Sequence, residues 1–220
     1  MSEALSIRFG EHDVSALLDA PADARAALVL AHGAGAGMAH PFMTRVAQGL
    51  AERDVATLRY QFPYMERRSR RTDPPKLAHT TVRAAVAEAA GRLPGVPLFA
   101  GGKSFGGRMT SQAQALEALR GVRGLVFLGF PLHPPGKPSV ERAEHLFDVT
   151  VPMLFLQGAR DDFAEPPLLE ALVAKLGARA TLRTFEHADH SFGVPKRLAR
   201  GDAVVALLEV AATWMIERAV

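Results

Sequence analysis

A serine between two glycines constrains this chain more than any other feature. Residues 102–106 read Gly-Lys-Ser-Phe-Gly, a G-x-S-x-G pattern that follows an apolar run and precedes a stretch of helical character. A serine in so sharp a strand-to-helix turn takes a strained backbone conformation. The residues two before and two after it must lack bulk, because the strand and helix backbones nearly touch there. The pattern predicts an exposed, activated hydroxyl at Ser104, beside the positive end of a helix.

Apolar runs of strand length alternate with longer runs of helical character along the chain. We expect strands at residues 5–9, 14–19, 26–31, 55–62, 97–101, 124–130, 152–157 and 180–186. We expect helices at residues 41–52, 79–92, 105–120, 166–176 and 196–217, a short helix at 139–146 and a loop at 63–75. The first two strands alternate moderately, as in an antiparallel edge hairpin.

This alternation is typical of βαβ units. It predicts a three-layer α/β fold in which helices cover both faces of a mostly parallel, twisted sheet. The chain has 220 residues, of which 48% are hydrophobic, and this suits one domain over residues 1–220. Only about twenty residues separate the strands expected at 124–130 and 152–157, too few for a separate lid domain.

Composition excludes several classes of function. The chain has no cysteine, and therefore no thiol nucleophile, disulfide or cysteine-bound metal. The formal net charge is +3, but the basic residues are mostly scattered, which argues against nucleic-acid binding. The first residues lack the apolar region of a signal peptide, and no apolar run approaches the roughly 20 residues that span a bilayer. We expect a cytoplasmic protein without a membrane partner; the oligomeric state stays open.

Candidate partners for the serine follow two later strands. Asp161 follows the strand expected at 152–157, and His190 follows the last strand. Serine needs a base within hydrogen-bond reach, histidine can move a proton at neutral pH, and a carboxylate orients the imidazole. We favour Asp161 over its neighbour Asp162 as the acid, and His190 over His187 as the base. The order Ser104, Asp161, His190 is that of α/β-hydrolases.

A glycine-rich loop at residues 32–37 follows the buried strand at 26–31. Backbone N–H groups of Ala34 and Phe105 would hold the oxyanion of a tetrahedral intermediate. We expect His32 to support this loop structurally. The histidines in His-Ala-Asp-His, residues 187–190, lie on a loop and lack a clear third ligand, so we expect no metal. The chemistry of such a site needs no cofactor.

These segments together resemble the α/β-hydrolase superfamily over nearly the whole chain. Within it, the chain is similar to small bacterial hydrolases without a lid, among them dienelactone-hydrolase-like proteins. The resemblance is carried by residues 32–35, 60–64, 101–108, 129–137, 157–161 and 189–192. It implies the α/β-hydrolase fold and a catalytic triad of Ser104, Asp161 and His190. Dienelactone hydrolases proper use a cysteine nucleophile, which this chain lacks.

The substrate is less constrained by the sequence. We expect a small molecule with an acyl bond, bound against Met38, Phe62, Tyr64 and Leu132. The arginine-rich residues 67–71 follow a strand end, and we expect them to border the pocket and to favour anionic substrates or an acidic partner.

Two other classes of function compete with hydrolysis. Gly-Gly-Lys-Ser at residues 101–104 is similar to part of a nucleotide-binding P-loop, but proline stands at position 97 where that motif needs glycine. A catalytically silent scaffold on a hydrolase fold is the main alternative, because a fold does not determine a function. The sequence pattern favours a serine hydrolase that acts on carboxylic esters or related acyl bonds.

Overall fold

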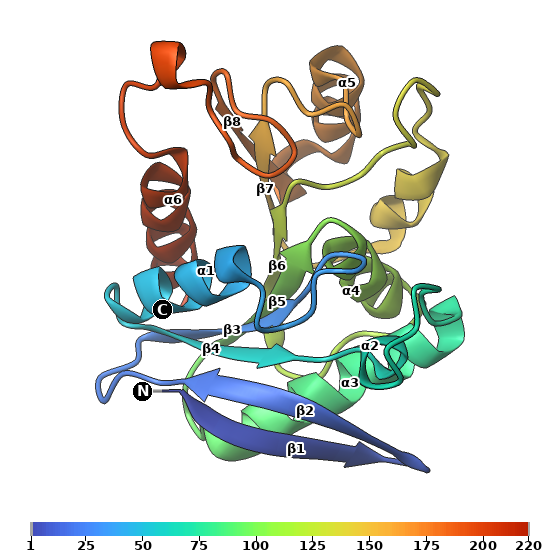
Figure 1. The fold of residues 1–220 in the computed structure, drawn as a ribbon, viewed down its shortest axis with the longest axis vertical. Coiled ribbons are helices and arrows are strands. Elements are labelled where there is room, and N and C mark those ends of the chain that lie inside the picture. The colour runs from blue at the N-terminus through green and yellow to red at the C-terminus, as the bar shows by residue number, and fades with distance from the viewer. Residues whose placement is uncertain (1, 220) are drawn as a thin grey trace.

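An eight-stranded sheet runs through the middle of the molecule, with helices on both of its faces (Figure 1). The computed structural model describes residues 2–219. The strands are β1 Glu3–Phe9, β2 His12–Asp19, β3 Ala26–Ala31, β4 Val55–Tyr60, β5 Leu98–Lys103, β6 Val122–Leu128, β7 Met153–Gly158 and β8 Ala180–Phe185. The α-helices are α1 Pro41–Ala51, α2 Pro63–Glu66, α3 Pro75–Arg92, α4 Phe105–Leu116, α5 Pro166–Leu176 and α6 Ala203–Glu217. The 3-10 helices are η1 Glu141–Asp148, η2 Gly177–Arg179 and η3 Lys196–Leu198.

The strand order places the functional loops together. The order is β1-β2-β4-β3-β5-β6-β7-β8, and β2 runs antiparallel to both of its neighbours, while the strands from β4 to β8 pair in parallel. The chain moves outward from β3 to β4, and then returns to the other side of β3 with β5. Ligands of open α/β sheets bind at such a reversal, beyond the carboxyl ends of the strands. Here that is the region after β3 and β5.

Two hydrophobic cores hold the layers together. On one face the sheet packs against α3, α4, α5 and η1, and the rings of Phe127, Phe130 and Phe155 meet in T-shaped or tilted contacts. On the other face α1 and α6 cover the sheet, and Trp214 of α6 packs on Phe99 of β5. Strands β3, β5 and β7 are buried along their whole length, as continuous apolar runs predict.

The fold class predicted from the sequence is confirmed, including the antiparallel edge hairpin. Several boundaries differ. The closing helix α6 begins at Ala203 instead of residue 196, because the Asp202 side chain accepts a 2.9 Å hydrogen bond from the Val204 N–H and caps the helix. Helix α3 starts four residues early, with Pro75 at its first position, where the missing N–H costs nothing. The expected loop at 63–75 contains α2, and α4 ends at Leu116.

The segment between β6 and β7 contains one short element, η1, and no separate lid. Its η1 packs against α4 (Figure 1). Within residues 2–219, no helix has both the length and the apolar character needed to cross a membrane.

Candidate active site

The turn between β5 and α4 has the strained geometry that the sequence predicts. Ser104 has φ 50° and ψ −115°, a combination that L-residues rarely adopt. A Cβ at Gly106 would lie 2.6 Å from the carbonyl oxygens of both Ala31 and His32, and one at Gly102 would overlap the carbonyl oxygen of Ala31. Only glycine fits at these two positions, because β5 and α4 both press against the end of β3.

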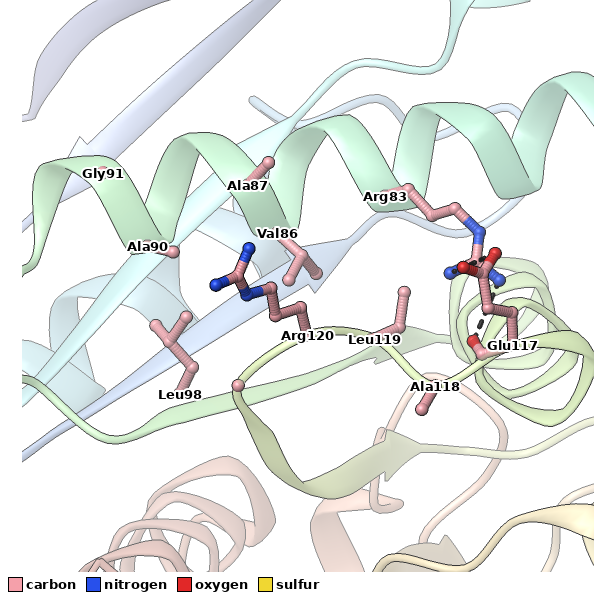
Figure 2. A pocket seen from close by; sticks show the side chains of 11 residues that line it. Arg83, Val86, Ala87, Ala90, Gly91, Leu98, Glu117, Ala118, Leu119 and Arg120 are labelled. Atoms are coloured by element: carbon pink, nitrogen blue, oxygen red, sulfur yellow. Dashed lines mark hydrogen bonds and ion pairs between the residues drawn. The ribbon is translucent and has the colours of Figure 1, made fainter.

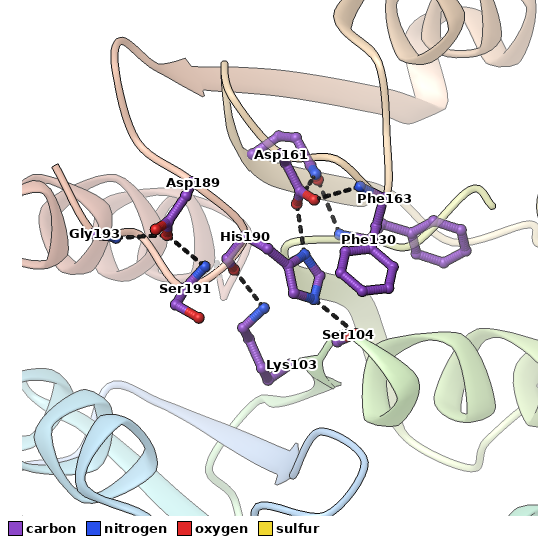
Figure 3. Close-up of polar contacts among 10 residues, drawn as sticks. Lys103, Ser104, Phe130, Asp161, Phe163, Asp189, His190, Ser191 and Gly193 are labelled. Atoms are coloured by element: carbon purple, nitrogen blue, oxygen red, sulfur yellow. Dashed lines mark hydrogen bonds and ion pairs between the residues drawn. The ribbon is translucent and has the colours of Figure 1, made fainter. Parts of the chain in front are cut away.

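A continuous chain of hydrogen bonds joins three side chains from three different loops (Figure 3). The Oγ atom of Ser104 lies 2.9 Å from Nε2 of His190. On the other side of the ring, Nδ1 of His190 lies 2.7 Å from Oδ2 of Asp161. Asp161 follows β7 and His190 follows β8, so adjacent parallel strands deliver both groups to the edge where Ser104 stands. This arrangement can remove a proton from the Ser104 hydroxyl.

The carboxylate at the end of this chain is fully enclosed. Asp161 is 3% exposed, and its Oδ1 accepts a 2.9 Å hydrogen bond from the Phe163 N–H. Its Oδ2 accepts a second bond, of 2.5 Å, from Nε2 of Gln157. The Oε1 atom of Gln157 in turn accepts from the Phe130 N–H at 2.9 Å. Sequence reasoning missed Gln157, although a polar side chain in the otherwise apolar β7 was an available signal.

Asp162 and His187, the alternatives to Asp161 and His190, lie outside this chain of hydrogen bonds. Asp162 is exposed and takes no part in the chain of hydrogen bonds. His187 contacts Glu186 at 3.3 Å and takes no part in the chain of hydrogen bonds. Among residues 2–219, no three His, Asp or Glu side chains gather in a way that could hold a metal ion.

The side chains of His32 and Tyr64 form hydrogen bonds that hold the loop after β3 in place. Nδ1 of His32 donates to the Gly33 carbonyl at 2.8 Å, and Nε2 accepts from the Phe62 N–H at 3.1 Å. The Tyr64 hydroxyl accepts the Gly35 N–H at 3.0 Å. The neighbouring residue Ala34 lines the cavity described below. His32 thus supports the loop, as the sequence predicts.

Burial makes His32 an acid-sensitive part of the fold. Loss of hydration is the main cause that lowers the pKa of His32 to about 4, against opposing contributions from its bond to Gly33 and from Asp73. The unfolded chain, with an ordinary histidine pKa near 6.5, binds the proton more tightly than the folded chain does. The stability that neutral His32 contributes is therefore complete above about pH 6.5 and is lost as the pH falls toward about 4.

We expect this one group to lower the free energy of unfolding by about 2 kcal/mol between about pH 7 and about pH 5. Urea unfolding at the two pH values measures the change. In His32→Gln the change should shrink by that amount, whereas His40→Gln, at an exposed position, should behave as the wild type does. An unchanged pH dependence in His32→Gln would mean that another group, such as the half-buried His145, dominates.

A cavity of about 310 Å³ opens beside Ser104. Its wall combines the loop after β3, the start of α1, the turn that carries Ser104 and the loops after β7 and β8. The lining residues are Gly33, Ala34, Ala36, His40, Phe42, Met43, Lys103, Ser104, Phe163, His190 and Ser191. Phe163 also packs against the His190 ring, with ring centroids 4.4 Å apart.

The predicted pocket wall needs correction. Met38, Phe62, Tyr64 and Leu132 are absent from the lining, and the last three are fully buried. Phe62 and Tyr64 pack against each other and against His32, and the Asp73 side chain accepts a 2.9 Å hydrogen bond from the Tyr64 N–H. The wall is built instead from α1, whose Phe42 and Met43 sequence reasoning assigned to no site.

The arginine-rich residues 67–71 do not line this cavity either. Arg67 forms a 2.7 Å ion pair with buried Asp73, and this contact ties the loop to the protein. The preference for anions or an acidic partner stays a prediction for this loop.

A second cavity, of about 610 Å³, lies near the amino ends of β5 and β6 (Figure 2). It is bordered by Leu98 at the start of β5 and by Gly121 before β6, whereas Ser104 follows the far end of β5. Its wall is mostly apolar, and Arg83 there pairs with Glu117 at 3.6 Å. Larger size does not make it the reactive site, because its lining contains no serine, threonine or histidine, and its one carboxylate, Glu117, is paired with Arg83.

Comparisons with known proteins agree with this architecture. A family model described as an alpha/beta hydrolase domain matches residues 24–216. A dienelactone hydrolase from Anabaena variabilis is 21% identical, with a TM-score of 0.79 over 99% of this chain and 97% of that one. A serine hydrolase without a lid from Xanthomonas campestris is 21% identical, with a TM-score of 0.74 over 99% and 94%. An alpha-beta serine hydrolase homologue from Coxiella burnetii is 16% identical, with a TM-score of 0.77 over 97% of each. At these identities the likenesses establish the fold.

Proposed function

Because this chain belongs to the alpha/beta hydrolase family, we propose that it is a serine hydrolase that cleaves a carboxylic ester, or a related acyl bond, of a small molecule. Ser104 attacks the acyl carbon, His190 takes its proton, and Asp161 orients His190. The observation that carries the proposal is the unbroken chain of hydrogen bonds from Ser104 Oγ to the buried carboxylate, at the wall of a cavity.

The proposed reaction has two halves. As Oγ bonds to the carbonyl carbon, Nε2 of His190 accepts the hydroxyl proton, and the imidazolium then gives it to the departing alkoxide. The acyl group remains on Ser104. Water attacks this acyl-enzyme, again with His190 as base, and releases the acid. The carboxylate of Asp161 keeps Nδ1 protonated at the start of each half and stabilises the imidazolium.

We propose that two backbone N–H groups hold the oxyanion. Phe105 is the first residue of α4, so its N–H has no partner within the helix and lies at the positive end of the helix dipole. Ala34, on the loop after β3, lines the cavity beside Ser104. One such donor is typically worth about 100- to 1,000-fold in rate. We propose both as the oxyanion hole.

The cavity favours a compact substrate. Its volume of about 310 Å³ lies at the small end of small-molecule sites. Phe42, Met43 and Phe163 give it apolar walls, while Ser191 and His40 add polar groups at the rim. We therefore propose esters of short acyl groups as the first substrates to test.

The proposal is tested by labelling with a fluorophosphonate, which reacts with activated serines. We expect the wild type to form one adduct, and peptide mass mapping should place it on Ser104. Ser191 is the matched control, because it also lines the cavity, whereas Nε2 of His190 is bonded to Ser104. Ser191→Ala should label as the wild type does, and Ser104→Ala should not label.

The proposal would be wrong if the wild-type protein did not label although circular dichroism showed it to be folded. The catalytically silent scaffold would then become the leading function. Labelling that persists in Ser104→Ala and vanishes in Ser191→Ala would place the nucleophile at the wrong residue and would reject the proposed mechanism.

A further inference from the structure

The side chain of Lys103 lies buried directly beside Ser104. Lys103 is only 9% exposed, and it borders the cavity. Its Nζ donates a 2.6 Å hydrogen bond to the main-chain carbonyl oxygen of His190 (Figure 3). Burial of an ammonium group is unfavourable, because the charge loses its hydration. A methionine would fill much the same space without this cost, so the amine must do more than pack.

The loop that carries His190 needs an external anchor. It is irregular, since both His187 and Phe192 have φ 62°. The Asp189 side chain accepts hydrogen bonds from the N–H groups of Ser191 at 2.8 Å and Gly193 at 2.9 Å. These bonds shape the loop internally but do not fix its position relative to Ser104. The Arg160 N–H joins the loop to the segment after β7 through a 2.9 Å bond to the Ala188 carbonyl, and the bond from Lys103 joins it to the residue that precedes the nucleophile.

Contacts with neighbouring segments also hold the Lys103 side chain in place. A Cβ at Gly33 would lie 3.4 Å from Cγ of Lys103, and one at Gly129 would lie 3.0 Å from its Nζ. The stem therefore passes between the loop after β3 and the end of β6. The ammonium group also lies 5.9 Å from the centroid of the Phe192 ring, on the same loop as His190. Lys103 thus contacts the loop after β3 and the loop that carries His190, both of which contribute to the proposed reaction.

We propose that Lys103 is a positioning residue for proton transfer: its ammonium group holds the His190 loop at the distance from Ser104 that the reaction requires. This inference rests on the proposed function of the same site. It predicts a loss in the chemical step rather than in substrate binding, because the ammonium group binds the histidine backbone.

The charge on Lys103 gives the proposal a pH signature. Burial is the main cause that lowers the pKa of Lys103 to about 8, and Asp161 and Asp189 act in the opposite direction. The charged and titratable groups that face it are Asp161 from the loop after β7, and Asp189 and His190 from the loop after β8. Above about pH 8 the ammonium loses its proton. The bond to His190 then weakens, because it is no longer assisted by charge.

The test measures the rate of fluorophosphonate labelling of Ser104 from about pH 6 to about pH 10. We expect Lys103→Met to react about 100-fold more slowly at neutral pH, since misplacement by about 1 Å costs that much. The wild-type rate should fall above about pH 8, and this fall should be absent from Lys103→Met. With an ester substrate, kcat should drop and KM should not. Lys137→Met, in an exposed loop, is the control and should match the wild type.

A chemical rescue experiment separates the effect of the Lys103 amine from the effect of its side-chain packing. The chain has no cysteine, so Lys103→Cys can be alkylated at that one position in urea and then refolded. Treatment with 2-bromoethylamine restores an ammonium group of nearly the original length, while 1-bromopropane gives a neutral isostere. We expect the first product to regain both the rate and the alkaline fall, and the second to regain neither. Wild type taken through the same refolding sets the reference.

The outcomes are separable. If the folded wild type does not label at Ser104, the proposed function fails, and this inference fails with it. If the wild type labels and Lys103→Met reacts equally fast with the same alkaline fall, only the role of Lys103 is overturned. If Lys103→Met does not fold, the two alkylated proteins decide, and equal rates from both would overturn the role.

Discussion

Replacing Ser104 with glycine should abolish turnover and raise the melting temperature at once. Removal of the nucleophile should lower kcat by roughly a million-fold, as in serine hydrolases whose triad acts as a unit. The stability gain comes from the backbone. Ser104 has φ 50° and ψ −115°, and such strain costs about 1–3 kcal/mol for a residue with a Cβ. Glycine adopts this conformation freely.

The gain is partly offset in the unfolded state. Glycine loses roughly 0.5–1 kcal/mol more conformational entropy on folding than alanine does. The net effect should be a stabilisation of about 1 kcal/mol, which raises the melting temperature of a chain of this length by about 2–4 °C. Differential scanning calorimetry on Ser104→Gly and Ser104→Ala measures it. Both variants lose the hydrogen bond to His190, so their difference isolates the backbone term.

The two readouts test separate claims. A Ser104→Gly protein that still turns over ester would show that the nucleophile lies elsewhere. An equal melting temperature for the glycine and alanine variants would show that the turn stores no strain. The expected combination, an inactive and more stable protein, would mean that the geometry at this turn is maintained for reactivity at the expense of stability.

The fold and the polar groups that meet at the site were predictable from the sequence for one reason. Parallel strands end at a common edge, so polar residues just after apolar runs converge in space whatever the intervening helices do. Ser104, Asp161 and His190 each follow such a run, and the structure brings these three side chains together. The glycines at 102 and 106 were interpretable because their role is steric and local.

The walls of the cavity were not predictable in this way. Whether Phe62 and Tyr64 turn toward the substrate or the core depends on Asp73, which binds the Tyr64 N–H at 2.9 Å from nine residues away. Phe42 and Met43 reach the cavity because α1 begins directly after the loop at 32–40, and apolar residues of a helix normally signal core packing. These placements are set by tertiary contacts, which local patterns do not carry.

The bond between Lys103 and His190 was predictable only in part. The sequence shows a lysine beside the serine, and a lysine near a helix start is most simply interpreted as solvated or paired with an acid. Its actual partner is a main-chain carbonyl on a loop 87 residues later. Backbone acceptors leave no mark in the identity of the residue that provides them, so this contact could come only from the structure.

Asp161→Asn should lower kcat by about 10,000-fold while Asp162→Asn leaves it unchanged. The reason is the direction of three hydrogen bonds. Both oxygens of Asp161 accept bonds from fixed donors, from the Phe163 N–H at Oδ1 and from Gln157 Nε2 at Oδ2, and Oδ2 also faces His190 Nδ1. Asparagine has one acceptor oxygen. That oxygen should stay on the rigid backbone donor of Phe163, which turns the amide group toward His190.

An amide N–H that faces Nδ1 changes the histidine tautomer. Nδ1 must then accept, so the ring proton moves to Nε2, which lies 2.9 Å from Ser104 Oγ. A protonated Nε2 cannot take the proton from serine, and the reaction stops although the geometry is intact. Steady-state kinetics with the best ester substrate measure the loss, and it should ease at high pH, where hydroxide can deprotonate Ser104 directly. A large loss in Asp162→Asn instead would assign the acid to the neighbour and would require the loop after β7 to rearrange before catalysis.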